Sequence, residues 1–258
     1  MRDSVFSLVS SVLLGIGGLC MYTGYDTQSL IVEPMLFSVY NREPDRIIDH
    51  AGYYGQALVY FCYMLMNLVV PTLLNYLSST RLMALGCTGS TIYMFSFMYP
   101  SNFLYFPSCV CLGIGMSCLH CGFTQRLTEI STRETIARNF SIAWSALSSS
   151  MIFGCCIYLV FASAAAVGDY RDYSDMEIRY VFGLFAAFGC VGVVLFLFLP
   201  TRQVNESVAS STENAKTSFM EQLRLIGDTM TDRRMLMVSP TFFYIGLFFG
   251  VLILVYPT

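Results

Sequence analysis

Apolar residues dominate the chain in long runs that contain no charged side chain. Short clusters of acidic and basic residues separate these runs from one another. The uncharged stretches are 4–25, 51–80, 82–125, 139–168, 180–201 and 235–258. A helix needs about 20 apolar residues to cross the roughly 30 Å hydrocarbon core of a bilayer. Each stretch is therefore long enough for at least one membrane-spanning helix.

The stretch 82–125 is long enough for two spans, and Tyr99-Pro100-Ser101-Asn102 interrupts it near its middle as a turn would. Strands of a membrane barrel are excluded, because they would be about 10 residues long and would alternate apolar with polar residues. Lipid offers the backbone no hydrogen-bond partner, so each span must be a helix. The predicted spans are 5–25, 54–76, 82–98, 103–123, 141–166, 180–199 and 240–256.

Composition supports the same class of protein. The 258 residues are 55% hydrophobic and 12% charged, whereas an ordinary soluble domain carries roughly 25% charged residues. An aromatic content of 15% excludes a disordered chain, and a net charge of −3 provides no basic surface for nucleic acid. The sequence therefore predicts an all-α, polytopic membrane helix bundle in a lipid bilayer.

Basic residues give the spans a direction. With the N-terminus in the cytoplasm, ten Lys and Arg residues lie in inner segments and four in outer segments, as the positive-inside rule requires. The first outer loop is predicted at 30–52 and the second inner loop, which holds Arg126, at 124–139. The polar segment 200–239 is the longest inner loop, and helical spacing within 219–230 predicts a short surface helix there.

Asp26 is the candidate functional acid of the first span. It falls inside the apolar register, near the predicted outer end of the helix, and Gln28 follows two positions later. An ionisable residue within a span is costly and indicates a functional site. The alternative is an acid that reaches water among the lipid headgroups, and the sequence leaves both interpretations open.

Polar side chains recur along the second span at intervals of three and four residues, which places them on one helix face. They are Tyr53, Gln56, Tyr60, Tyr63 and Asn67. Lipid solvates amides and phenols poorly, so we expect this face to point into the bundle. There it either forms hydrogen bonds between helices or lines a cavity for substrate or water. The candidate binding residues are Asp26, Gln28, Gln56, Tyr60 and Asn67.

Other kinds of site are not expected. All ten cysteines fall within predicted spans, where they are small packing residues, so no disulfide is predicted. Cys118-Leu119-His120-Cys121 has the spacing of a metal-ligand pair, but a zinc site usually needs a second pair, and none is visible. We find no nucleophile elbow and no phosphate-binding glycine loop. The sequence therefore predicts no metal, no cofactor and no enzymatic activity.

Several motifs in this order resemble the uncoordinated-93 (Unc-93-like) family. The first is Tyr22-Thr23-Gly24-Tyr25-Asp26-Thr27-Gln28, and Gly52-Tyr53-Tyr54-Gly55-Gln56-Ala57 opens the second span. The most specific stretch begins at Leu112-Gly113-Ile114-Gly115 and continues through Thr124-Gln125-Arg126-Leu127-Thr128-Glu129 to Gly154. The resemblance covers residues 5 to about 200 and, less clearly, the seventh span.

This resemblance implies a fold of the major facilitator superfamily. Residues 1–199 would form its N-terminal six-helix half, 200–239 the cytoplasmic loop between halves, and 240–258 a seventh helix. The chain would then be such a protein truncated to one half plus one helix. The resemblance also implies a regulatory subunit of a potassium channel, which binds its partner membrane protein in the plasma membrane. The alternatives are a facilitator-type transporter of a small solute or ion, a receptor-trafficking escort, and a homo-oligomer that supplies the second half.

Overall fold

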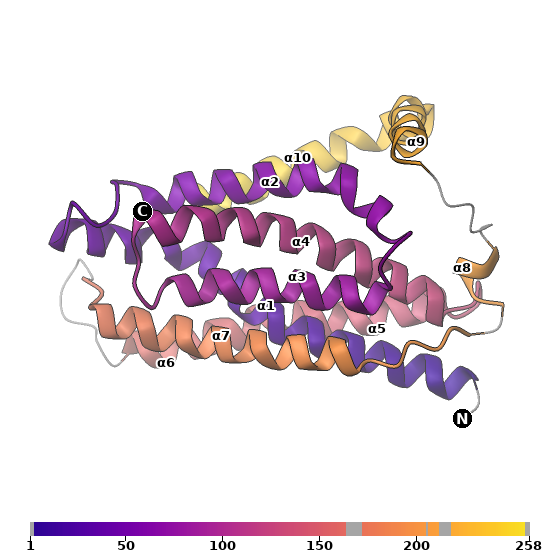
Figure 1. The fold of residues 1–258 in the computed structure, drawn as a ribbon, viewed down its shortest axis with the longest axis horizontal. Helices are drawn as coiled ribbons and strands as arrows, with labels where there is room; N and C mark the ends of the chain where they lie inside the picture. Colours follow the sequence, from indigo (N-terminus) through magenta and orange to yellow (C-terminus); the bar gives the residue numbers. More distant parts are fainter. Residues whose placement is uncertain (1–2, 164–171, 205, 212–217, 256–258) are drawn as a thin grey trace.

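The computed structural model describes residues 3–163, 172–204, 206–211 and 218–255. The regular structure in these ranges is entirely helical, and the long helices run side by side in an elongated bundle (Figure 1). The helices are α1 Asp3–Arg42, α2 Ala51–Leu73, α3 Ser79–Ser96, α4 Asn102–Ile130, α5 Ile136–Ser148, α6 Ser150–Ser163, α7 Asp175–Phe198, α8 Val208–Ser211, α9 Phe219–Thr231 and α10 Arg233–Val255. The predicted all-α membrane bundle is confirmed.

Five of the seven predicted spans coincide with helices that are long and apolar enough to cross a membrane. These are α1, α2, α4, the nearly continuous run of α5 and α6 over 136–160, and α7. Helices also occupy the third and seventh predicted positions, as α3 and α10. Helix α3 is less apolar than the five, since its sequence holds several serine, threonine and glycine residues. The ends of the fifth and seventh predicted spans, 164–166 and residue 256, lie outside the described residues.

Helix α3 is less apolar because most of its surface contacts other helices, although a narrow stripe that includes Leu85, Ile92 and Phe95 is exposed. It packs against α4 on one side and α7 on the other. Its contact with α4 is close enough to require glycine: a Cβ added at Gly86 would lie 2.4 Å from the carbonyl oxygen of Gly115. Small residues of this kind let two backbones approach each other inside a membrane bundle.

The first helix is longer than predicted. It runs without interruption from Asp3 to Arg42, so it occupies much of the predicted outer loop 30–52. The prediction of a span ending at residue 25 is therefore wrong at that boundary. The charge of Glu33 suggests a loop, but this side chain is buried within the helix. Its carboxylate lies 3.0 Å from the His50 imidazole and accepts a 3.1 Å hydrogen bond from the backbone N–H of Tyr53.

The second inner loop is correspondingly shorter than predicted. Helix α4 continues to Ile130 and α5 begins at Ile136, so most of the predicted loop 124–139 is helical. The break between α5 and α6 falls at Ser149. The surface helix expected over 219–230 is confirmed as α9, which has no buried residue among those described.

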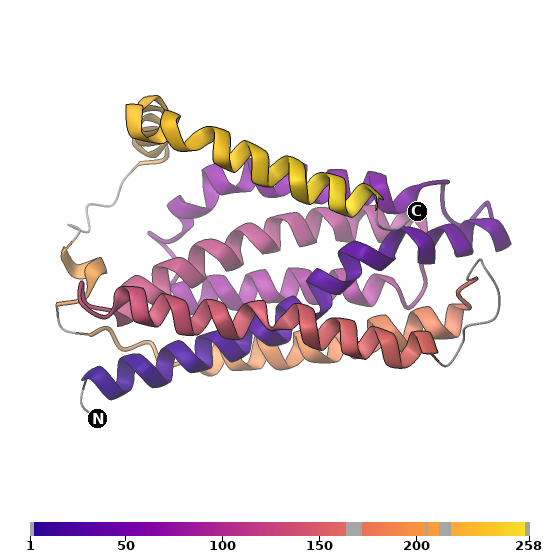
Figure 2. The same ribbon diagram turned by 180° about the vertical axis from the view of Figure 1, so that it is seen from behind.

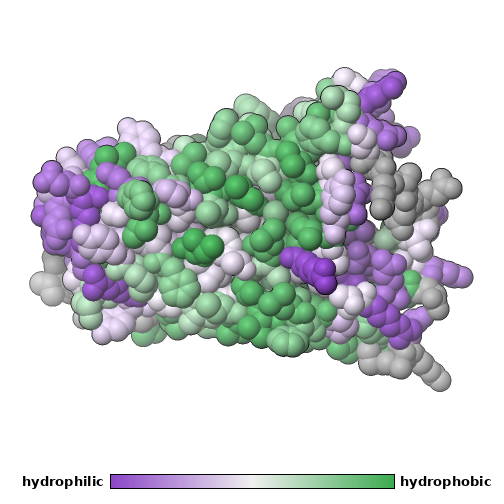
Figure 3. Space-filling view, viewed as in Figure 1, coloured by the Kyte–Doolittle hydropathy of each residue, from purple (hydrophilic) through white to green (hydrophobic). Residues whose placement is uncertain are grey.

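Charged side chains tie the helices together at both ends of the bundle. At one end, Arg42 contacts Asp172 at 2.7 Å and Asp175 at 2.8 Å, and Arg46 contacts Asp175 at 2.6 Å. At the other end, Arg202 pairs with Asp3 at 2.5 Å. Figure 3 shows hydrophilic surface at the two ends and a hydrophobic belt between them, as expected for a bundle that crosses a bilayer.

The first residue of α1 and the last residue of α10 lie at opposite ends of this bundle. Helix α1 begins at the end of the bundle where α8 and α9 also lie, whereas α10 finishes at the other end (Figure 1). Helix α10 stands apart from the bundle formed by α1–α7, and its described side chains are largely exposed (Figure 2).

Candidate functional site

A pocket of about 320 Å³ lies among α1, α2, α5 and α6. Figure 2 shows the side of the bundle where α1 crosses between α2 and the α5–α6 run. The lining includes Asp26 and Ser29 of α1, Tyr60 of α2 and Trp144 of α5. The pocket thus joins two of the five candidate binding residues, Asp26 and Tyr60.

Asp26 lies in the middle third of α1. The helix continues for 16 residues beyond it, to Arg42, so the expected position near the outer end is wrong. Its Oδ2 accepts a hydrogen bond of 2.7 Å from the Ser150 hydroxyl, at the first residue of α6. Within the described residues, no Lys, Arg or His forms an ion pair with it. Asp26 is therefore a carboxylic acid deep in a span with a hydroxyl as its polar neighbour.

Aromatic rings form the wall around this acid. Tyr22 and Tyr25 stand edge to face, with ring centroids 5.8 Å apart, and Tyr60 and Trp144 approach from two other helices. The Tyr22 hydroxyl is 2.6 Å from Nε2 of His120 in α4. The other ring nitrogen of His120 lies 3.0 Å from the Met116 carbonyl oxygen. A carbonyl only accepts, so Nδ1 carries the hydrogen and Nε2 accepts from Tyr22.

Gln28 and Gln56 form a separate buried cluster. The Tyr93 hydroxyl donates to Oε1 of Gln28 at 2.8 Å, and Nε2 of Gln56 lies 3.4 Å from the same oxygen. Neither glutamine lines the pocket at Asp26. The cluster connects α1, α2 and α3, so its evident role is to hold three helices together.

Asn67 also lies away from the pocket. Its side-chain oxygen accepts a hydrogen bond of 2.8 Å from Ser117 of α4, yet the residue as a whole is exposed. Along the predicted polar face of α2, Gln56 is buried, whereas Tyr60 is 44% exposed. Gln56 therefore points into the bundle as expected, whereas Tyr60, which lines the pocket, and Asn67, which bonds to α4, are also exposed at the surface.

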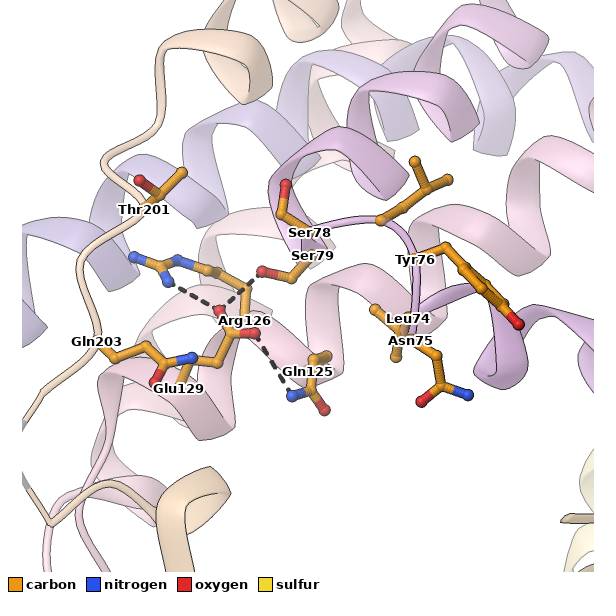
Figure 4. A pocket seen from close by; sticks show the side chains of 11 residues that line it. Leu74, Asn75, Tyr76, Ser78, Ser79, Gln125, Arg126, Glu129, Thr201 and Gln203 are labelled. Atoms are coloured by element: carbon orange, nitrogen blue, oxygen red, sulfur yellow. Dashed lines mark hydrogen bonds and ion pairs between the residues drawn. The ribbon is translucent and has the colours of Figure 1, made fainter. Parts of the chain in front are cut away.

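A second pocket, of about 470 Å³, lies at the end of the bundle near the start of α1 (Figure 4). Arg126 is 1% exposed, and its Nη1 contacts Glu129 Oε2 at 2.8 Å. Glu129 also accepts a 2.7 Å hydrogen bond from Ser79. The guanidinium donates as well to the carbonyl oxygens of Pro200 and Arg202. Sequence reasoning placed Arg126 in a loop, so it missed this buried ion pair.

Comparison with known proteins identifies the family. The family model described as "Ion channel regulatory protein UNC-93" matches residues 43–258. The chain belongs to the UNC-93 family. It is 26% identical over 253 residues to the UNC93-like protein MFSD11 of Xenopus laevis, covering 93% of this chain and 55% of that protein. It is 25% identical over 209 residues to the UNC93-like protein MFSD11 of Xenopus tropicalis, covering 81% and 45%.

This UNC-93 family chain thus spans about half the length of the curated relatives it matches. The family match begins after α1, so the helix that carries Asp26 lies outside it. The chain is a multi-pass membrane protein of the UNC-93 type, in agreement with its apolar helices.

The cysteines of this UNC-93 family chain were considered above as disulfide partners and, in the Cys118–Cys121 motif, as metal ligands. All ten cysteines are free thiols. Both ring nitrogens of His120, in the Cys118–Cys121 motif, are engaged by Tyr22 and Met116. Across the described ranges, no three His, Cys, Asp or Glu side chains gather as a metal site would require.

Proposed function

We propose that this chain is a non-enzymatic integral membrane protein that regulates a partner membrane protein by binding it, and that the partner is a potassium channel. The family match over residues 43–258 carries this proposal, because the family is described as one of ion channel regulatory proteins. We further propose that 1–199 act as a six-helix body, 200–239 as a cytoplasmic loop and 240–258 as the first helix beyond it.

The exposed face of α2 supports binding to another membrane protein. Tyr60 and Asn67 are seven residues apart, so they lie on the same face two turns from each other. Both residues are exposed, and Tyr60 also lines the pocket at Asp26. Hydroxyl and amide groups on a membrane helix are poorly solvated by lipid and favour protein neighbours. We propose that this face is the docking surface for the channel.

We propose that the protein resides in the plasma membrane with its N-terminus in the cytoplasm. The ten-to-four distribution of basic residues supports this direction. Tags placed before Met1 and after Thr258 test it: antibody should reach the second tag in intact cells and the first only after permeabilisation. Staining of the N-terminal tag in intact cells would reverse the assignment.

Co-expression with a two-pore potassium channel tests the regulatory function. We expect the chain to co-purify with the channel and to change its current density. The double substitution Tyr60→Leu and Asn67→Leu should abolish both effects. Val194→Leu, at an exposed position of α7, is the matched control and should change neither. A channel that neither co-purifies nor changes its current would contradict the proposal for that class of partner.

The pocket at Asp26 favours a second candidate function, facilitator-type transport of a small solute or ion. A carboxylic acid in the middle of a span, lining a cavity, is a common feature of transport pathways. Uptake into proteoliposomes that contain the chain without a channel would support transport. In that case Asp26→Asn should abolish uptake, whereas unchanged uptake would show that the carboxylate has no part in it.

A further inference from the structure

We infer that the pocket at Asp26 is a binding site for a small organic ammonium ion, a ligand of about the size of choline. This inference names the ligand class of the cavity that the transport candidate uses. It requires neither transport nor a partner protein, because it concerns equilibrium binding alone.

The charge of the pocket selects a cation. Asp26 is the single ionisable acid among the ten residues that line it, and none of the ten is Lys, Arg or His. Within the described residues, Asp26 has a serine hydroxyl and no basic side chain as its partner. An uncompensated carboxylate in a membrane span attracts a positive charge and repels an anion.

The aromatic lining selects an organic cation over a metal ion. Tyr22, Tyr25, Tyr60 and Trp144 come from three helices and surround the acid. Aromatic faces bind quaternary ammonium groups through the ring quadrupole. A calcium ion would need about six to eight oxygen ligands. The pocket offers one carboxylate and a few hydroxyl groups, among them that of Ser29.

The size and remaining lining of the pocket limit the ligand further. A volume of about 320 Å³ is near the lower end of the range for small-molecule sites. Leu147 and Met151 supply apolar surface beside the rings. A compact ammonium ion with methyl or short alkyl substituents matches this combination of one charge, several rings and aliphatic walls.

The single tryptophan of the chain lines this pocket, so its fluorescence reports binding directly. We would titrate the full chain of 258 residues, in lipid nanodiscs, with choline and with 3,3-dimethylbutan-1-ol, its uncharged carbon analogue. We expect a saturable change in Trp144 fluorescence with choline. The uncharged analogue should bind at least about tenfold more weakly, the equivalent of about 1.4 kcal/mol.

Substitutions at Asp26 and Tyr60 measure separately what the carboxylate charge and the aromatic rings contribute to choline binding. Asp26→Asn should weaken choline binding at least about tenfold, whereas Asp228→Asn, an equal charge change on exposed α9, should leave it unchanged. Tyr60→Leu should weaken binding by about 2- to 30-fold, and Tyr60→Phe should retain it, since the ring face is what binds. Tyr60 is exposed, so these two variants keep the test valid even where Asp26→Asn fails to fold.

Three results would overturn the inference. One is the absence of any saturable response to choline in monodisperse protein. Another is equal affinity for choline and its uncharged analogue. The last is unchanged choline affinity in both Asp26→Asn and Tyr60→Leu. Loss of channel co-purification with choline binding intact would count against the regulatory function alone, so the two failures are distinguishable.

Discussion

Breaking the buried ion pair between Arg126 and Glu129 should strongly destabilise the bundle. The Arg126 side chain is 1% exposed and that of Glu129 is 11% exposed, so both charges are largely removed from solvent. Removing one partner of a buried pair costs about 3–5 kcal/mol, because the other charge remains desolvated. We therefore expect Glu129→Gln to lower the free energy of unfolding by about 3 kcal/mol or more.

The double variant distinguishes this explanation from simple loss of packing. In Arg126→Met combined with Glu129→Leu, no charge remains buried, although the carbonyl oxygens of Pro200 and Arg202 lose their donor. Its destabilisation should therefore be well below the sum of the effects of Arg126→Met alone and Glu129→Leu alone, with a coupling energy of about 1–3 kcal/mol.

Equilibrium unfolding in mixed detergent micelles would measure these free energies. Arg133→Gln and Glu134→Gln provide the matched control, because both side chains are exposed near the same end of the bundle. They should change stability by no more than about 0.5 kcal/mol. Additive single effects at 126 and 129, or losses as small as those of the controls, would refute the argument that desolvated charge dominates this site.

Three further changes test backbone packing, a titrating contact and a helix cap. Gly86→Val should lower the free energy of unfolding by about 2 kcal/mol or more, because the added Cβ would clash with backbone atoms of α4. Gly183→Val is the control: the nearest atom to its Cβ is 3.6 Å away, so it should lower that free energy less in the same unfolding assay. The Glu33 carboxylate raises the pKa of His50 above its usual value of about 6.5, so this contact stabilises the fold below that pH and weakens as the pH rises through the folded-state pKa. The unfolding midpoint should therefore fall above about pH 6.5, and His50→Gln should flatten that part of the profile; an unchanged slope would contradict the assignment. Ser174→Ala removes the capping box of α7 and should lower the free energy of unfolding by about 1 kcal/mol. Thermal unfolding measures this loss, and an unchanged unfolding midpoint would contradict it.

The spans were predictable because a bilayer imposes a simple rule on sequence. Twenty or so uncharged residues must form a helix in lipid, whatever their neighbours. The rule works least well for α3, because many of its serines, threonines and glycines pack against α4 and α7 and do not face lipid. It also cannot set a boundary where a charged residue has a partner far away in sequence, as Glu33 has in His50.

The candidate site was predictable only in part. Asp26 and Tyr60 do share a pocket, and both were identifiable as polar residues within apolar runs. Gln28 and Gln56 were identifiable by the same signal, yet a hydrogen bond from Tyr93 places them in a structural cluster. Residue type and helical period cannot distinguish a pocket-lining residue from a member of a buried hydrogen-bonded cluster, because the difference depends on which neighbouring helix supplies a partner.

The length of α1 affects how the bundle can sit in membranes of different thickness. Its 40 residues extend for about 60 Å, twice the roughly 30 Å of a typical hydrocarbon core. The ion pairs at Asp3 and Arg42 mark its two ends. A thicker bilayer would cover more turns of this helix without pulling charge into lipid. Hydrophobic mismatch at α1 is therefore met by the length of this helix itself.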